Sequence, residues 1–404
     1  MNFFLLIRYI ITSFFIIFII LCLSNPVFAM PTSNNPKYYL IGYKNTLKTD
    51  LFTKENNIKI VEDYKNLHIA RVLISQKQVK LLKQNYRDHL SFIEKDSYAS
   101  TKNASNIKPS LEENQYIGFF NAEKFRNNKL YNTYTGKGVK IGVLDTGIDY
   151  HHSDLNIKGG TAPVDRNEGT NYMDYVGHGT FVAGIIASRK TGIAPDAEVY
   201  AIKSISDSGD GSWSNIIRGI DWAINNKMDI LNMSVGTSEY SRGLEEAINK
   251  AYEKGIFIVA PVGNNGYDKS SNVTYPAKFK HVFAVGSVDI TGKRSNFSSV
   301  GNEIDTMAPG QEIFSTSLNN SYDYNSGTSM ASPYVAANAA LIKSANPNVT
   351  NDEITYIFVN NSIKFGRHYE YGNGILNITS ALKSSLAKKE KPAVLQTYQK
   401  IHWN

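Results

Sequence analysis

The stretch 325-NSGTSMASPYVAANAALI-342 decides how the rest of the chain is interpreted. It opens with a tight turn around Gly327 and continues with small and apolar residues at helical spacing. We expect Pro333 in the first helical turn, where a missing N–H costs nothing. Ser329 then lies at the helix N-terminus, beside backbone N–H groups and the positive end of the helix dipole. A serine there either caps the helix or attacks a carbonyl group while its own N–H stabilises the oxyanion.

Two more side chains of catalytic type lie at the edges of predicted elements. Asp145 follows the buried-strand pattern of residues 139–144 in VLDTGID, where a carboxylate can orient a partner. His178 lies in GHGTFVAGII between two glycines, which let the backbone present an imidazole in a crowded cleft. In this chain order the aspartate would hold the imidazole, the histidine would take the serine proton, and the serine would form an acyl-enzyme.

Each of these motifs also has another interpretation. Aspartic proteases use DTG, but they need two such motifs or a dimer of short subunits, and this long chain has one. A histidine near a helix start is often structural, and a serine there often only caps the helix. The occurrence of all three residue types at element edges favours the catalytic interpretation.

Cysteine content and charge exclude several function classes. The one cysteine, Cys22, lies in the apolar N-terminal run, so the mature part has no thiol for catalysis, metal binding or a disulfide. Residues 31–102 hold thirteen Lys and Arg against seven Asp and Glu, and the basic tail 383–404 holds five against one. The net charge of +7 therefore belongs to segments that we expect to be removed or peripheral, and we expect no nucleic-acid binding.

The N-terminus predicts secretion. Residues 1–29 have a basic residue, Arg8, then an apolar run from Tyr9 to Leu23, then a small-residue cleavage site ending at Ala29. This is typical of a cleaved signal peptide and an extracellular or cell-envelope protein. The alternative is an uncleaved anchor, in which case the membrane would be a partner.

Residues 31–102 read as a small α+β module with strands over 37–43, 67–74 and 90–94 and a helix over 76–86. The polar stretch from Ser97 to Asn114 that follows is predicted to be a linker or a processing site. Beyond it, continuous apolar strands over 139–144, 198–205, 229–235, 256–262 and 282–288 alternate with helices over 181–188, 214–226 and 244–254. This rhythm predicts an α/β fold with a parallel sheet flanked by helices on both faces.

The blocks VLDTGID, HGTFVAG and GTSMASP resemble the three signature blocks of the subtilisin-like serine proteases, and the resemblance extends over about residues 115–382. It implies a catalytic domain over 103–382. It also implies that 31–102 is a propeptide of ferredoxin-like fold, which assists folding and then inhibits the active site until it is cut off. In VAPVGNNG, Asn264 matches the oxyanion asparagine of the family.

The resemblance further implies a substrate groove. Ser234, Val235 and Gly236 resemble the strand that pairs with an extended peptide and lines the first specificity pocket. Gly209 and Gly211 resemble the opposing edge, so that the substrate would be an added strand. Trp213 occupies the place of an aromatic residue over a more distant pocket, and Thr274 lies at the base of the first pocket.

Two departures from the family limit what the resemblance implies. The segment from Ile186 to Pro195 is too short for the loop that wraps a calcium ion in many secreted members, although Asp154 aligns with one ligand. We therefore expect no metal and no cofactor, with the usual calcium site truncated. Thr274 leaves no acid in the first pocket, so a strict preference for Arg or Lys is not expected.

These observations predict a secreted serine endopeptidase, made as a zymogen, that acts on proteins or peptides through an acyl-enzyme on Ser329. Its own propeptide would be an intramolecular inhibitor. A narrow-specificity maturation protease, such as a lantibiotic leader peptidase, is the alternative within this chemistry. A catalytically silent relative that only binds peptides is the alternative from another class.

Overall fold

The computed structural model describes residues 35–44, 57–101, 129–164 and 170–387. The predicted signal peptide 1–29 and most of the predicted basic tail lie outside these ranges. So does the part of the predicted linker beyond residue 101. Among the described residues, no helix is both long and apolar enough to span a membrane.

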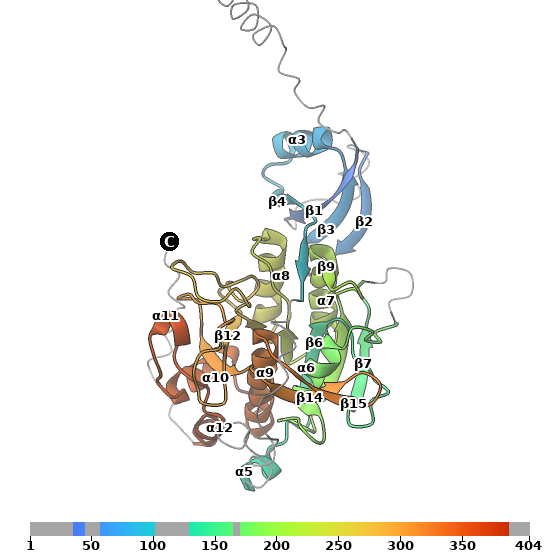
Figure 1. The fold of residues 1–404 in the computed structure, drawn as a ribbon. Coiled ribbons are helices and arrows are strands. Elements are labelled where there is room, and N and C mark those ends of the chain that lie inside the picture. Colours follow the sequence, from blue (N-terminus) through green and yellow to red (C-terminus); the bar gives the residue numbers. More distant parts are fainter. Residues whose placement is uncertain (1–34, 45–56, 102–128, 165–169, 388–404) are drawn as a thin grey trace, which may run out of the picture.

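The larger of two units contains a seven-stranded parallel sheet (Figure 1). Its strand order is β13-β12-β11-β10-β6-β8-β7. Its strands are β6 (Lys140–Asp145), β7 (Ile157–Thr161), β8 (Glu198–Lys203), β10 (Ile230–Met233), β11 (Phe257–Pro261), β12 (Phe283–Val288) and β13 (Thr306–Pro309). The predicted α/β class with a parallel sheet is confirmed.

Helices cover both faces because the strands present apolar residues alternately to either side. In β6, Ile141 and Val143 belong to the core under one set of helices, and Leu144 belongs to the core under the other. The first set is α6 (His178–Ala187), α9 (Thr328–Ala345), α10 (Asn351–Asn361) and α12 (Ile378–Leu386). The second set is α7 (Trp213–Asn225) and α8 (Arg242–Glu253). Two short helices, α5 (Lys129–Thr133) and α11 (His368–Tyr371), complete the unit.

Three elements of the larger unit carry too weak an apolar pattern to be predicted. The edge strand β7 contains two consecutive glycines and few apolar side chains, and β13 is short. The hairpin of β14 (Ile313–Ser317) and β15 (Ser321–Asn325) is polar, and Asn319 and Asn320 in its turn have positive φ angles of 59° and 57°. Asparagine tolerates this left-handed conformation well, which suits it to such turns.

The N-terminal unit is an antiparallel sheet of order β2-β3-β1-β4 with one described helix. Its elements are β1 (Lys37–Tyr43), β2 (Lys59–Tyr64), β3 (Ile69–Ile74), α3 (Gln76–Asn85) and β4 (Leu90–Lys95). Ser75 and Gln78 form a capping box that starts α3. Residues 45–56 lie outside the described ranges, so a ferredoxin-like arrangement stays a prediction.

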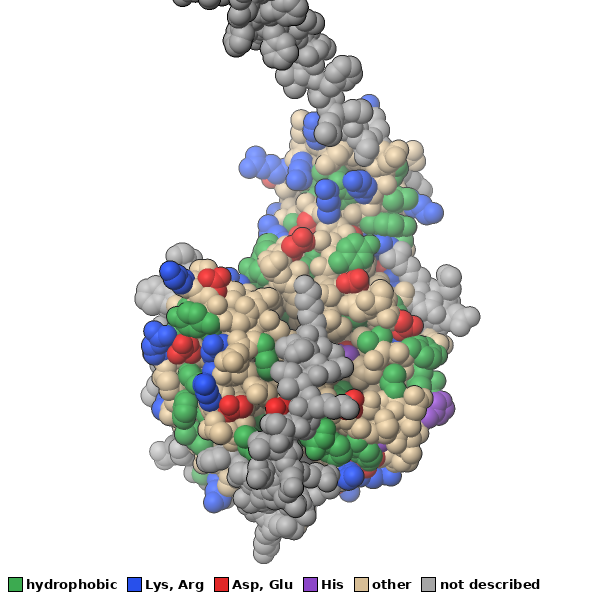
Figure 2. Space-filling model, viewed as in Figure 1, with side chains coloured by type: hydrophobic (Ala, Val, Ile, Leu, Met, Phe, Trp, Pro, Cys, Tyr) green, Lys and Arg blue, Asp and Glu red, His purple; other side chains and the backbone are tan. Residues whose placement is uncertain are grey.

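The N-terminal unit sits on the N-terminal ends of α7 and α8 (Figure 1). Glu94 accepts hydrogen bonds from the Ser241 hydroxyl at 2.7 Å and from the Arg242 and Gly243 amides at 3.0 and 2.9 Å. Asp96 accepts from the amide and the hydroxyl of Ser214 at 3.0 and 2.8 Å. Carboxylates at helix N-termini are stabilised by the free N–H groups and the dipole. Basic side chains gather on the outer surface of this unit (Figure 2).

Two expectations about chain geometry are corrected. Pro333 does not lie in the first turn of its helix, because α9 already begins at Thr328 and Pro333 lies inside it. Part of the stretch predicted as a linker is structured, since Tyr98–Ser100 form strand β5, which pairs with β9 (Asp210–Ser212). Both elements adjoin the site described next.

Candidate active site

The carboxyl end of β6 and the first turn of α6 bring a carboxylate and an imidazole together. Asp145 is the last residue of β6, and His178 is the first residue of α6. His178 Nδ1 and Asp145 Oδ1 are 2.7 Å apart, and both side chains are buried. Gly179 is required here, because a Cβ at this position would lie 2.0 Å from the Gly147 carbonyl oxygen. The two predicted residues therefore form a directly hydrogen-bonded pair.

A buried hydrogen-bond network that the sequence analysis missed supports this pair. Asp174 Oδ1 accepts from the Thr146 hydroxyl and from the amides of Val176 and Gly177, each at 2.9 Å. Asp174 Oδ2 accepts from the amide and the hydroxyl of Thr180 at 2.9 and 2.7 Å. The carboxylate thus caps the helix that begins with His178 and ties it to the residue that follows Asp145. Its only signal in the sequence is its position four residues before His178.

The charges around His178 favour the imidazolium. Burial lowers the pKa of His178, but the charge and the hydrogen bond of Asp145, together with the charge of Asp174, outweigh this lowering. The pKa therefore lies above its ordinary value of 6.5. A group that accepts a proton during a reaction is assisted by such surroundings, because they stabilise its protonated form.

Ser329 lies in the first turn of α9, next to the start of α6. The following residue, Met330, shares a buried cluster with Phe181 and Ile185 of α6, which places the N-terminal turns of the two helices side by side. Ser329 is 5% exposed. His178 Nε2 is buried and makes no hydrogen bond to any described residue, so its bond to Ser329 is not formed in this structure.

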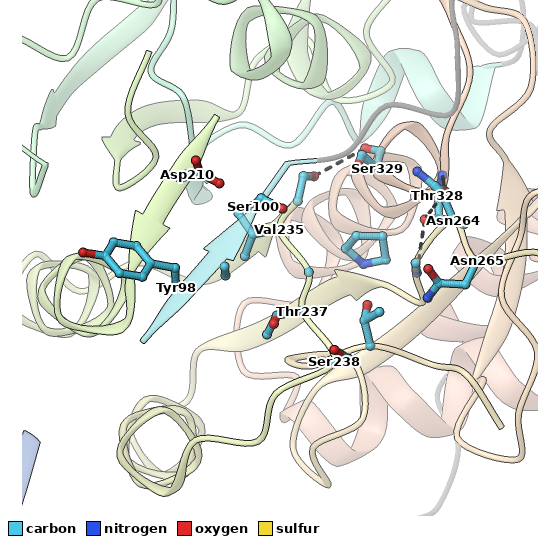
Figure 3. A pocket seen from close by; sticks show the side chains of 16 residues that line it. Tyr98, Ser100, Asp210, Val235, Thr237, Ser238, Asn264, Asn265, Thr328 and Ser329 are labelled. Atoms are coloured by element: carbon cyan, nitrogen blue, oxygen red, sulfur yellow. Dashed lines mark hydrogen bonds between the residues drawn. The ribbon is translucent and has the colours of Figure 1, made fainter. Parts of the chain in front are cut away.

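Asn264 follows β11 and lies beside Ser329 (Figure 3). Its carbonyl oxygen Oδ1 accepts from the amide of Thr328 at 2.9 Å and from the hydroxyl of Thr328 at 2.8 Å. The Thr328 hydroxyl in turn accepts from the Gly263 amide at 3.3 Å. Because Oδ1 is engaged by Thr328, the amide nitrogen of Asn264 is directed away from Thr328. Thr328 is a second residue that the sequence analysis missed, although it is part of the GTS block.

These features coincide with matches to known proteins. The model of the subtilase family matches residues 136–374. The chain belongs to the subtilase family. Subtilisin NAT from Bacillus subtilis subsp. natto is 36% identical over 361 residues, which are 86% of this chain and 91% of that protein. The minor extracellular protease Epr from Bacillus subtilis (strain 168) is 34% identical over 383 residues, which are 91% of this chain and 58% of that protein.

A solved structure supports the same family. Fervidolysin from Fervidobacterium pennivorans, described as a keratinolytic enzyme related to subtilisin, matches with a TM-score of 0.75 and 25% identity. The match covers 88% of this chain, which spans 62% of the length of that structure. The predicted family and enzyme class are thereby confirmed, and the chain is a subtilisin-like serine peptidase.

In this subtilase, strand β5 and the residue after it cross the site as an added strand. Residues 98–100 pair antiparallel with β9, in the register Tyr98↔Ser212, Ala99↔Gly211 and Ser100↔Asp210. On its other side, Ser100 exchanges two backbone hydrogen bonds with Gly236, of 3.3 and 3.1 Å. The Thr101 amide donates to the Gly209 carbonyl at 3.1 Å. The segment therefore lies between two backbone edges.

A cavity of about 360 Å³ adjoins this strand. The residues predicted for the first pocket, Ser234, Val235, Gly236 and Thr274, line it together with Asn264 and Ser329 (Figure 3). Gly209 and Gly211 contact the added strand from β9 and the residues before it. Trp213 does not line this cavity. It is buried in the core cluster that also contains Ala99 of the strand, and its amide donates to the Ser97 carbonyl at 2.8 Å.

Asp154, the residue that the resemblance aligned with a calcium ligand, accepts hydrogen bonds within the chain. Asp154 Oδ2 accepts from the Ser188 hydroxyl and from the Lys190 amide, the latter at 3.2 Å. The Lys190 ammonium lies 4.5 Å from the ring centroid of Tyr322. In the described ranges, no group of three or more His, Cys, Asp or Glu side chains is arranged to hold a metal.

Proposed function

We propose that this subtilase is made as a secreted zymogen and cleaves peptide bonds within proteins through an acyl-enzyme on Ser329. The observation that carries the proposal is the buried 2.7 Å contact between His178 Nδ1 and Asp145 Oδ1, with Ser329 at the adjacent helix end. Asp145 would fix the imidazole so that Nε2 faces the serine.

The reaction follows from these positions. Ser329 Oγ attacks the substrate carbonyl carbon while its proton passes to His178 Nε2. The tetrahedral intermediate collapses, the C–N bond breaks, and the imidazolium gives the proton to the leaving amine. Water then attacks the ester carbonyl carbon while His178 takes its proton. The bond between Ser329 Oγ and the acyl carbon breaks, the imidazolium returns the proton to Ser329 Oγ, and the carboxylic acid product leaves.

Asn264 and the Ser329 amide are the proposed donors to the oxyanion. Thr328 supports this role, because it holds Asn264 Oδ1 and so leaves Nδ2 directed away from Thr328. A donor that is already oriented before the reaction costs no reorganisation when charge develops on the substrate oxygen.

Inhibition by the N-terminal unit is supported by the strand 98–101 in the groove and by the carboxylates of Glu94 and Asp96 on α8 and α7. While that strand is paired, another peptide cannot form the same hydrogen bonds. The apolar segment within residues 1–29 supports secretion.

The test is expression of the full chain as wild type, as Ser329→Ala and as the control Ser344→Ala. Ser344 is another serine of α9, and its hydroxyl donates to the Leu341 carbonyl away from the site. We expect wild type and Ser344→Ala to release the N-terminal unit, to hydrolyse a chromogenic peptide and to be labelled by phenylmethylsulfonyl fluoride. Ser329→Ala should remain full-length and unlabelled. A Ser329→Ala chain that processed itself would contradict the proposal.

A further inference from the structure

The carbonyl group of Ser329 lacks the partner that an α-helix normally supplies. In an α-helix this oxygen accepts the N–H of the residue four positions later, and here that residue is Pro333, which has no N–H. Ser329 and Pro333 are both buried, so water is not at hand to replace the missing donor. An unsatisfied buried carbonyl is costly and requires another partner.

Ser234, just beyond the end of β10, supplies that partner. Its hydroxyl donates to the Ser329 carbonyl at 3.3 Å. Asn232 Nδ2 donates to the same hydroxyl at 2.8 Å, and the Ser332 hydroxyl lies 3.2 Å from it. One consistent assignment lets Ser234 Oγ accept from Asn232 and Ser332 and give its only proton to Ser329. All three of these side chains are fully buried.

We propose that Ser234 is a positioning residue, whose hydroxyl replaces the missing N–H of Pro333 and fixes the backbone of Ser329. The inference rests on the proposed function of Ser329. Two residues after Ser234, Gly236 exchanges two backbone hydrogen bonds with the strand in the groove. The short segment from Ser234 to Gly236 therefore contacts both the proposed nucleophile, Ser329, and the peptide strand in the groove. Because Pro333 has no N–H, the backbone of Ser329 is fixed by the segment around Ser234 and Gly236, and not by the next turn of α9.

A double-mutant cycle tests the proposal on the processed enzyme from the full chain. Ser234→Ala removes the donor, Pro333→Ala restores an N–H to the helix, and the double variant has the N–H without the hydroxyl. Active sites are titrated with phenylmethylsulfonyl fluoride, and kcat and KM are measured on one peptide. Ser344→Ala is the control, since it removes another hydroxyl that donates to a carbonyl of α9.

We expect Ser234→Ala to lower kcat between about 10- and 100-fold with little change in KM, because a small misplacement of a reacting group has effects of this size. In the Pro333→Ala background the same substitution should lower kcat less than about threefold, because the helix then satisfies the carbonyl. Melting temperatures of the four proteins, measured in the Ser329→Ala chain to prevent self-digestion, separate this effect from a loss of stability.

Two results with folded variants would overturn the inference. One is an unchanged kcat in Ser234→Ala with a lowered melting temperature, which would mean that the hydroxyl only stabilises the fold. The other is a kcat loss of equal size in both backgrounds, which would mean that the two residues do not act on one carbonyl. If Ser234→Ala fails to fold, an active double variant supports the inference and a double variant that also fails overturns it. An inactive wild type would instead contradict the proposed function.

Discussion

Replacing Asp174 by asparagine tests whether the buried network controls His178. The carboxylate accepts three hydrogen bonds at Oδ1 and two at Oδ2. An asparagine keeps the first oxygen but presents an NH₂ group to the amide and hydroxyl of Thr180. The hydroxyl can turn and accept, whereas the Thr180 N–H loses its acceptor. One unsatisfied buried donor costs about 1–3 kcal/mol, which corresponds to a melting temperature lower by about 2–12 °C for a domain of this size.

The same substitution removes a negative charge that acts on His178. The pKa of His178 is raised in part by Asp174, so it should fall in the variant. His178 must be neutral to accept the serine proton, and kcat/KM therefore rises as pH increases through this pKa. The acid limb of the pH profile should thus move to lower pH in Asp174→Asn. The imidazolium interaction stabilises the folded state fully below the unfolded pKa, and this contribution is lost as pH rises through the raised folded pKa.

The assay is kcat/KM against pH on one peptide, together with thermal unfolding in the Ser329→Ala chain. Asp149→Asn is the matched control. Asp149 is also a buried carboxylate, and it accepts from the amides of His151 and Asn319, but it is not among the groups that shift the pKa of His178. We expect the control to lose stability with an unmoved acid limb. An Asp174→Asn limb that stays in place or moves to higher pH would refute the electrostatic reasoning.

Four further predictions concern other parts of the molecule. Asn264→Ala should lower kcat about 100- to 1,000-fold by removing an oxyanion donor. Asn265 is the matched control, because its side chain donates to the Asn272 carbonyl. Asn265→Ala should lower kcat far less, and equal losses of kcat in the two variants would contradict the role of Asn264 as oxyanion donor. Glu94→Gln should lower the melting temperature of the Ser329→Ala chain, because three donors of α8 lose a charged acceptor. Glu253→Gln, at an exposed residue of α8, should leave the melting temperature unchanged. Equal melting temperatures in the two variants would count against the contact between Glu94 and the start of α8. A calcium chelator should leave activity and melting temperature unchanged, since Asp154 is already bonded to Ser188 and Lys190; a large loss of either would show that a metal binds. N-terminal sequencing of the processed enzyme should place the cut beyond Thr101, because the Thr101 amide still pairs with the Gly209 carbonyl in the groove; a mature N-terminus at or before Thr101 would disprove this register.

Sequence patterns predicted the parts of this protein whose structure depends on local composition. Strands such as β6 and β11 are mostly apolar runs; β6 ends at Asp145, and Asn264 lies three residues after the end of β11. Side chains at the carboxyl ends of parallel strands gather at one edge of the sheet. Motif and periodicity together were therefore enough to place Asp145, His178 and Ser329 on their elements, and the family resemblance added Asn264.

Other features depend on contacts between distant segments and left no local pattern. Asp174 is one acidic residue in a polar loop, and its role becomes visible only when Thr146 and Thr180 converge on it. Ser97–Thr101 have the composition of a linker, but their N–H and C=O groups find partners at Gly209 and Gly236. Pro333 was expected at a helix start because a carbonyl deprived of its donor is costly, and the donor that relieves this cost comes from Ser234, outside the helix.

Under the proposed function, the two backbone edges that enclose Ser100 and Thr101 would also select polypeptides by the shape of their main chain. Each edge accepts a hydrogen bond from a backbone amide, one at the Gly236 carbonyl and one at the Gly209 carbonyl. A proline at the position of Ser100 or Thr101 has no N–H to donate to these carbonyls. A helix or a tightly curved loop would have to unfold before it could lie extended between the two edges. Resistance to cleavage would therefore depend first on the conformation of a polypeptide's main chain and only then on its side chains.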